Sequence, residues 1–134
     1  MKAEIIIDEL IVNTIIGIHP HEREYKQPLH ISLSFQYNTE KAVKSDSVDD
    51  SVDYDQLSQQ IKSFVEHHSF QLIETCAEKI ADLVLENKTI QKVSLFVYKP
   101  HALEDAKRVG IKILREQTKE ISPTPHENVL LNWD

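Results

Sequence analysis

Residues 28–38 read PLHISLSFQYN, and apolar and polar residues alternate along them more regularly than anywhere else in the chain. Every second residue is apolar, and polar residues stand between them; the apolar residues are Leu29, Ile31, Leu33, Phe35 and Tyr37. Successive side chains of a β-strand point to opposite faces of a sheet. The stretch therefore predicts a strand with one buried face and one polar face.

Three further segments have the character of strands. Residues 3–16 are rich in isoleucine and valine, whose branched side chains suit a pleated sheet better than a helix. Residues 92–97 and 109–113 alternate apolar with other residues over shorter lengths. Lys99 shares the parity of the apolar face before it, which predicts an amine directed inward at the end of a strand.

Two amphipathic helices are predicted between the second and third strands. Apolar residues recur at intervals of three and four within residues 54–67 and again within residues 71–86. Asp53 and Gln56 have the spacing of a helix-capping pair. The order strand, strand, helix, helix, strand, strand predicts an α+β fold, with a four-stranded, mainly antiparallel sheet and both helices on one face. The polar residues 17–28 are predicted to form a long loop.

The chain is of a length that suits one domain, with 134 residues of which 40% are hydrophobic. We expect a single domain over residues 1–116. Prolines and charges leave no regular period in residues 117–134, which are expected to form a C-terminal tail.

Composition excludes several classes of protein. Two glycines, Gly17 and Gly110, are too few for a glycine-rich phosphate loop, and a formal charge of −7 does not fit a nucleic-acid binder. The single cysteine, Cys76, has no partner for an intramolecular disulfide and fits a reducing compartment. Because no apolar run suits a signal peptide or a membrane helix, we expect a cytoplasmic protein with no membrane partner.

Metal and thiol chemistry find little support in the sequence. His19 and His21 are close enough to share a metal ion, and His101 could join them, but no Cys-x-x-Cys or His-Glu-x-x-His motif accompanies them. The acidic residues 46–55 lack the glycine and the final glutamate of a calcium loop. Cys76 lies on the apolar side of a predicted helix, where a thiol is usually buried and inert. We therefore expect no metal site.

Four polar residues remain as candidates for chemistry: Glu22 in the loop, Tyr54 and Glu74 at the starts of the two helices, and Lys99 at a strand end. Each also has a structural interpretation, since Glu74 could complement a helix dipole, Tyr54 could pack and Glu22 could be a solvated charge. Lys99 is the strongest candidate, because an amine held against an apolar face loses hydration and tends to have a lowered pKa.

Five groups of residues, in order along residues 3–116, carry a resemblance. They are Gly17-Ile18-His19-Pro20-His21-Glu22-Arg23, Gln27-Pro28-Leu29, Lys44-Ser45-Asp46 with Val52-Asp53-Tyr54, Leu72-Ile73-Glu74-Thr75-Cys76-Ala77-Glu78, and Tyr98-Lys99-Pro100-His101-Ala102-Leu103 with Val109-Gly110-Ile111. Together they resemble the bacterial dihydroneopterin aldolases, whose tunnelling fold has the strand and helix order reached above from periodicity.

The resemblance implies a retro-aldol reaction of folate biosynthesis, in which dihydroneopterin is split into 6-hydroxymethyl-dihydropterin and glycolaldehyde. It implies that Glu74 anchors the pterin, helped by main-chain groups of Ile73. It further implies that Lys99 is the general acid and base, and that Tyr54 and Glu22 line the side-chain end of the substrate. Subunits of that family join their sheets into rings, so the resemblance implies a homo-tetramer or homo-octamer with sites at subunit interfaces.

The residue types agree with this chemistry. A pterin presents an amino group and a ring N–H side by side, and one carboxylate can accept both. The ring imine of the substrate can take up the electrons of the broken carbon–carbon bond, so no Schiff base, metal or cofactor is required. Lys99 and Tyr54 then only move protons.

Two alternatives stay open. The related epimerase of dihydroneopterin triphosphate shares the fold and many of the motifs, although Arg23, Lys26, Lys107 and Arg108 do not clearly form the basic cluster that a triphosphate needs. The chain could also be a non-catalytic pterin or purine binder, against which Lys99 argues. Residue His101, where many relatives have glycine, and the tail depart from the family pattern.

Overall fold

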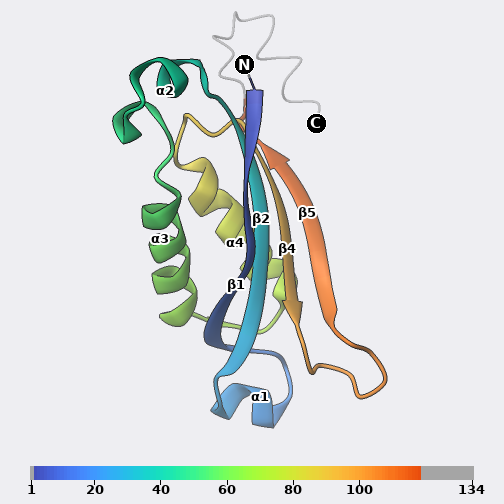
Figure 1. Ribbon diagram of the computed structural model, residues 1–134. Helices are drawn as coiled ribbons and strands as arrows, with labels where there is room; N and C mark the ends of the chain where they lie inside the picture. The colour runs from blue at the N-terminus through green and yellow to red at the C-terminus, as the bar shows by residue number, and fades with distance from the viewer. Residues whose placement is uncertain (1, 119–134) are drawn as a thin grey trace, which may run out of the picture.

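The computed structural model describes residues 2–118, in which a β-sheet is covered on one face by two helices (Figure 1). The sheet has five strands in the order β3-β1-β2-β4-β5. The elements are β1 (Lys2–Ile16), α1 (Pro20–Glu24), β2 (Gln27–Asn38), α2 (Glu40–Ser45), a 3-10 turn (Val48–Asp50), α3 (Tyr54–Glu66), β3 (Ser69–Phe70), α4 (Ile73–Leu85), β4 (Lys92–Lys99) and β5 (Val109–Glu116).

Long antiparallel pairings hold the sheet together. β1 pairs with β2, β2 with β4, and β4 with β5, all antiparallel. The register of β1 against β2 shifts between Ile7 and Leu10, and Glu9 within this bulge has a positive φ of 56°. The bulge accounts for the acidic interruption that the sequence shows in an otherwise apolar strand.

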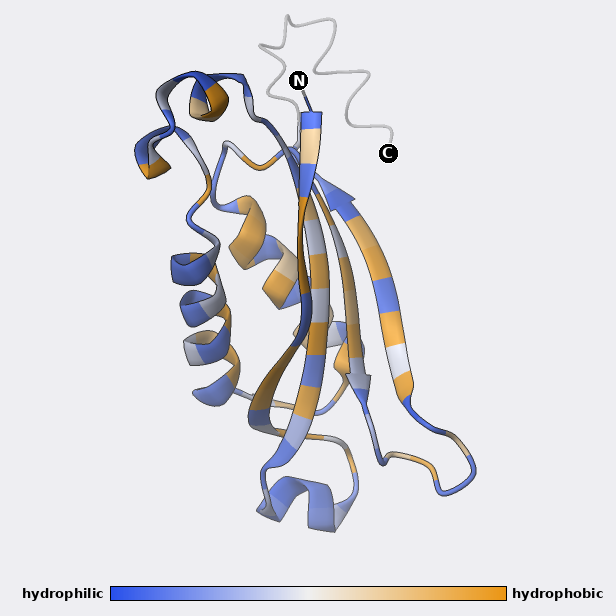
Figure 2. Cartoon of the chain, viewed as in Figure 1, coloured by the Kyte–Doolittle hydropathy of each residue, from blue (hydrophilic) through white to orange (hydrophobic). Residues whose placement is uncertain are grey.

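The core lies between the sheet and the helices, and β2 supplies the centre of it. All five alternating apolar side chains of β2 are buried, as the sequence predicts. Helix α3 buries Leu57, Ile61 and Val65 against the sheet, and α4 buries five residues: Cys76, Ala77, Ile80, Ala81 and Val84. Figure 2 shows the hydrophobic residues alternating along the strands. Helix α4 runs back antiparallel to α3, so the predicted helix pair is confirmed (Figure 1).

The prediction of four strands is wrong, because the connection between the helices contains β3. Its two residues pair in parallel with Ile15 and Ile16 at the end of β1. The buried Thr14 hydroxyl donates hydrogen bonds to the carbonyl oxygens of Val65 and His68, at 2.8 and 3.0 Å. These bonds fix the end of α3 to β1 and bring the following residues alongside it. The helix predicted over residues 54–67 ends at Glu66, one residue earlier.

The residues predicted as loop and turns contain short helices. Helix α1 begins with Pro20, whose fixed φ suits the first helical position. Helix α2 ends at Ser45, and the Asp46 that caps it adopts the left-handed conformation with a φ of 54°. The predicted cap of α3 is confirmed on one side, since the Asp53 carboxylate accepts a hydrogen bond of 3.0 Å from the backbone N–H of Gln56.

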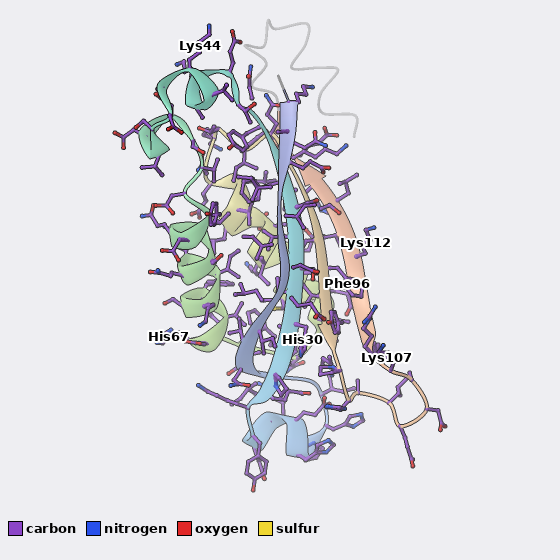
Figure 3. All side chains as sticks on the ribbon, in the orientation of Figure 1. His30, Lys44, His67, Phe96, Lys107 and Lys112 are labelled. Atoms are coloured by element: carbon purple, nitrogen blue, oxygen red, sulfur yellow. The ribbon has the colours of Figure 1, made fainter. Side chains whose placement is uncertain are left out.

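The face of the sheet without helices is less uniformly polar than the sequence suggests. Tyr98 is only 4% exposed there, although its neighbours in the chain face the core. Its hydroxyl contacts the Glu9 carboxylate and lies 3.1 Å from His30 Nδ1, and the Arg108 guanidinium covers its ring. The bond raises the pKa of Tyr98 and lowers that of Glu9. Figure 3 labels His30, Phe96 and Lys112, which lie on this face.

No helix among residues 2–118 is both long and apolar enough to cross a membrane. Most of the predicted tail, residues 119–134, lies outside the described residues. Gln117 is still attached to the domain, because its side-chain amide donates a 2.7 Å hydrogen bond to the Leu85 carbonyl.

Candidate active site

A pocket of about 280 Å³ opens where β4 ends and α4 begins, near α1 at the lower end of Figure 1. Several segments far apart in the sequence form its walls. The lining residues are Gly17, Ile18, His19, Glu22, Gln71, Leu72, Ile73, Glu74, Lys99, Ala102, Leu103 and Val109. The pocket therefore joins four of the five predicted site residues: Glu22, Ile73, Glu74 and Lys99.

An ion pair between Lys99 and Glu22 forms one wall. Lys99 Nζ donates a hydrogen bond of 2.8 Å to Glu22 Oε2, and the two side chains are only 13% and 11% exposed. Lys99 thus points inward at the end of β4, as its parity predicts. Its carboxylate partner is 77 residues away in the chain and was not predicted.

Glu22 is held as a carboxylate by three donors. The hydrogen bond from Lys99 lowers the pKa of Glu22 from 4.5 to about 2, assisted by Gln27 and the backbone of His19 and opposed by burial. Gln27 Nε2 donates to Glu22 Oε2 at 3.3 Å, and the His19 N–H donates to Glu22 Oε1 at 3.3 Å. At neutral pH Glu22 is therefore ionised and has little tendency to accept a proton.

The backbone before α1 is shaped to admit this carboxylate. Gly17 has a φ of +134°, a conformation that residues with a side chain rarely adopt. A Cβ at this position would overlap the Glu22 carboxyl group. One of the two glycines of the chain therefore stands where a strand must turn closely past a charged group.

Glu74 lines the same pocket, in the first turn of α4 beside Ile73. Its side chain is exposed, and it makes no hydrogen bond or ion pair within residues 2–118. The pocket therefore offers one unpaired carboxylate to a ligand with N–H donors.

Tyr54 does not line this pocket. It begins α3, is 59% exposed, and borders a separate hollow together with Asp46, Val48 and Val52. The single chain brings Glu22, Ile73, Glu74 and Lys99 together and leaves Tyr54 apart from them.

The rim of the pocket is apolar, which sequence reasoning missed. Ile18, Leu72 and Leu103 line it and are 63%, 47% and 59% exposed. Ile18 and Leu103 belong to segments without a regular period, and Leu72 stands at the N-cap of α4, before the buried stripe of that helix begins, so no pattern marks them as rim residues. Such a rim offers apolar surface to the faces of a flat ring or to another chain.

Other candidates from the sequence lie outside this arrangement. His19 lines the pocket and its ring is stacked on that of His21, whereas His101 is exposed and is not among the lining residues. Within residues 2–118, no three His, Cys, Asp or Glu side chains are placed to share a metal ion. Cys76 is fully buried, and burial raises the pKa of its thiol to about 12.

Known proteins resemble this chain over most of its length. The family model for dihydroneopterin aldolase matches residues 5–114. The dihydroneopterin aldolase of Haemophilus influenzae is 33% identical over 111 residues, which are 83% of this chain and 94% of that protein. The dihydroneopterin triphosphate 2'-epimerase of Pseudomonas aeruginosa is also 33% identical over 111 residues, 83% of this chain and 90% of that protein. The crystal structure of Escherichia coli dihydroneopterin aldolase in complex with neopterin matches with a TM-score of 0.81 and 33% identity, over 84% of this chain and 98% of that one.

Proposed function

The chain belongs to the dihydroneopterin aldolase family, and from that premise we propose that it cleaves 7,8-dihydroneopterin into 6-hydroxymethyl-7,8-dihydropterin and glycolaldehyde, a step of folate biosynthesis. One observation carries the proposal: a single pocket is lined by both an unpaired carboxylate, Glu74, and a shielded ammonium, Lys99. The first group suits the binding of a pterin and the second suits the transfer of protons.

Glu74 would anchor the pterin. The amino group and the adjacent ring N–H of the substrate can both donate to one carboxylate, and such paired, charge-assisted bonds fix orientation as well as affinity. The main chain of Ile73 would add a contact beside it. The apolar rim residues Ile18, Leu72 and Leu103 would pack against the ring.

Lys99 would act as general acid and base, with Tyr54 as the second proton-transfer group. The reaction removes a proton from a side-chain hydroxyl, breaks the adjacent carbon–carbon bond, and passes its electron pair to the ring imine. Returning a proton to the pterin side-chain carbon completes the product. Glu22 lines the side-chain end of the substrate and holds Lys99 Nζ in place, and this scheme needs neither a metal nor a Schiff base.

The charges of the pocket favour the aldolase over the triphosphate epimerase. The lining residues carry two carboxylates, Glu22 and Glu74, against one ammonium, Lys99, so they supply no excess of positive charge for a triphosphate. Arg108 covers Tyr98 on the other face of the sheet, and neither Lys26 nor Lys107 lines the pocket. Because an epimerase and an aldolase are equally identical to this chain, identity does not separate the two activities.

The proposal includes an assembly of several copies. The catalytic domain, residues 1–116, would form a homo-tetramer or homo-octamer in which Tyr54 of one subunit completes the pocket of a neighbour. Three features support this: Tyr54 is exposed away from its own pocket, the pocket rim is apolar and exposed, and β5 leaves one sheet edge unpaired among the described residues.

The test is incubation of the full chain with 7,8-dihydroneopterin and, separately, with its triphosphate, followed by chromatography of the products. Release of glycolaldehyde from dihydroneopterin supports the proposal. An isomeric triphosphate without glycolaldehyde would assign the epimerase instead. Tight pterin binding without any turnover would assign a binding protein.

A further inference from the structure

We propose that Arg23 is a positioning residue that sets the distance between the two halves of the pocket. One half is the segment after Gly17, which carries Glu22, and the other is the segment after Phe70, which carries Glu74. This inference rests on the proposed function and adds a residue to it. Arg23 follows Glu22 directly in α1 but is not among the residues that line the pocket. Its effect on the reaction would therefore pass through other groups.

The contacts of Arg23 are with backbone oxygens. Arg23 Nη1 donates hydrogen bonds to the carbonyl of Gly17 at 3.2 Å and to that of Phe70 at 2.7 Å, and both bonds are partly buried. The Phe70 carbonyl also accepts a 3.0 Å bond from the N–H of Gly17. Arg23 forms no ion pair among residues 2–118, so its charge is directed to these two carbonyls.

The junction is the place where the end of β1 meets β3. The Thr14 hydroxyl holds the residues just before β3, through its bonds to the carbonyls of Val65 and His68, but few backbone bonds join the two strands themselves. The parallel pairing of β1 with β3 covers only two residue pairs, Ile15 with Ser69 and Ile16 with Phe70. One bond, from Gly17 to Phe70, continues it. The guanidinium of Arg23 therefore adds two hydrogen bonds at the point where both segments of the chain leave the sheet.

Both segments enter the pocket directly beyond the junction. After Gly17 come Ile18 and His19, and the short helix that carries Glu22. After Phe70 come residues 71–74, which end at the carboxylate proposed to hold the pterin. One half thus positions Glu22, the partner of Lys99, and the other half positions Glu74.

Arginine suits this place better than lysine. Both bonds come from one nitrogen, Nη1, whose two N–H groups have fixed directions in the plane of the guanidinium, whereas a lysine ammonium is a point charge on a flexible stem. A displacement of about 1 Å between a bound substrate and a catalytic group can reduce the rate by about a hundred-fold. A modest shift at the junction would therefore lower turnover, while each half would keep its own contacts.

The variants Arg23→Met and Arg23→Lys test the proposal, with Arg115→Met as the matched control. Arg115 pairs with Glu78 on the exposed surface and lies outside the pocket. We expect kcat for dihydroneopterin cleavage to fall about ten-fold or more in Arg23→Met and less in Arg23→Lys, consistent with a shifted reacting geometry. The dissociation constant for 6-hydroxymethyl-7,8-dihydropterin should stay close to that of the parent, with one site per chain. The control should keep the parental kcat.

A loss of stability alone would lower the number of pterin sites and leave kcat per site unchanged, which would overturn the proposal. An unchanged kcat with full binding would overturn it too. Amide hydrogen exchange at Gly17 and residues 71–74 gives a readout without turnover, and it should accelerate in both Arg23 variants and not in the control. If the parent releases no glycolaldehyde, the proposed function fails, and unchanged exchange would then reject the positioning role separately.

Discussion

At the scale of single residues, the ion pair between Glu22 and Lys99 links the site to pH. The pKa of Glu22 is lowered from 4.5 to about 2, so folding favours its charged form. Its contribution to the free energy of unfolding is fully present above pH 4.5 and is lost as the pH falls from 4.5 towards 2. We expect the stability difference between the parent and Glu22→Gln to shrink over this interval. Denaturant unfolding of both proteins from pH 6 to pH 2 measures this difference. If the two plots of unfolding free energy against pH stay parallel, the lowered pKa of Glu22 is contradicted.

Binding and turnover should depend on different residues. Glu74→Ala should mainly weaken pterin binding, by about 1.5–3 kcal/mol, because it removes hydrogen bonds to a charged acceptor. Lys99→Ala should mainly lower kcat, by about 10²–10⁴-fold, because it removes a proton-transfer group. Fluorescence titration with the product and steady-state kinetics separate the two effects.

Lys62→Ala is the control for both, since Lys62 is an exposed residue of α3 outside the pocket. Turnover of Lys99→Ala within a few-fold of the parent would remove Lys99 from the mechanism. Parental affinity in Glu74→Ala would mean that another group binds the pterin.

At the scale of elements, the cap of α3 can be tested by itself. Asp53→Ala removes the acceptor of the Gln56 N–H and should lower the free energy of unfolding by about 0.5–2 kcal/mol. Asp55→Ala is the matched control, because Asp55 lies in the same first turn but accepts only a side-chain bond, from Gln59. Chemical denaturation that ranks the two variants equally would show that the cap does not stabilise the helix.

The elements whose hydrophobic pattern repeats over many residues were predictable from the sequence, and the short elements were not. Strand β2 buries every second residue, so its pattern alone determines its faces. Strand β3 has two residues and exists because Thr14 and the end of β1 hold it, which no local pattern records. Helix α1 depends on a proline and on a carboxylate that bonds back to the His19 N–H, in a segment too polar to show a period.

The site divides in the same way. Inward direction of Lys99 followed from strand parity, and the position of Glu74 followed from the helix start. The grouping of these residues in one site came from the family resemblance, since sequence spacing does not reveal which ends of strands and helices meet in the fold. The contact between Lys99 and Glu22 depends on how β4, α1 and the turn at Gly17 meet in three dimensions, so only the folded structure contains it.

At the scale of the whole molecule, the proposal that Tyr54 completes the pocket of a neighbouring subunit makes a prediction about mixtures of variants. Tyr54→Phe and Glu74→Ala should each be impaired alone, because each removes one contribution to every pocket. Mixed assemblies should regain part of the activity, since some interfaces then combine an intact Tyr54 from one subunit with an intact Glu74 from another. Activity assays after unfolding and refolding the mixture, with subunit exchange verified by mass spectrometry, measure the recovery.

Verified subunit exchange without recovered activity would contradict the proposed shared site and would leave the proposed aldolase chemistry unaffected. A fully active monomer in sedimentation experiments would contradict it as well. Tyr54 would then have to reach the pocket of its own chain, from which it is separated in the structure.

The burial of Cys76 makes the rate at which its thiol is labelled a measure of local opening in this protein. The chain has one thiol, and it is fully buried in α4, two residues after Glu74. A thiol reagent can react only when α4 opens away from the sheet, so the labelling rate reports the free energy of that opening without any introduced probe. A ligand held by Glu74 would keep α4 closed and slow the reaction in proportion to its occupancy. Inhibitors could therefore be ranked by the delay they impose on one native cysteine, even in an enzyme variant with no remaining turnover.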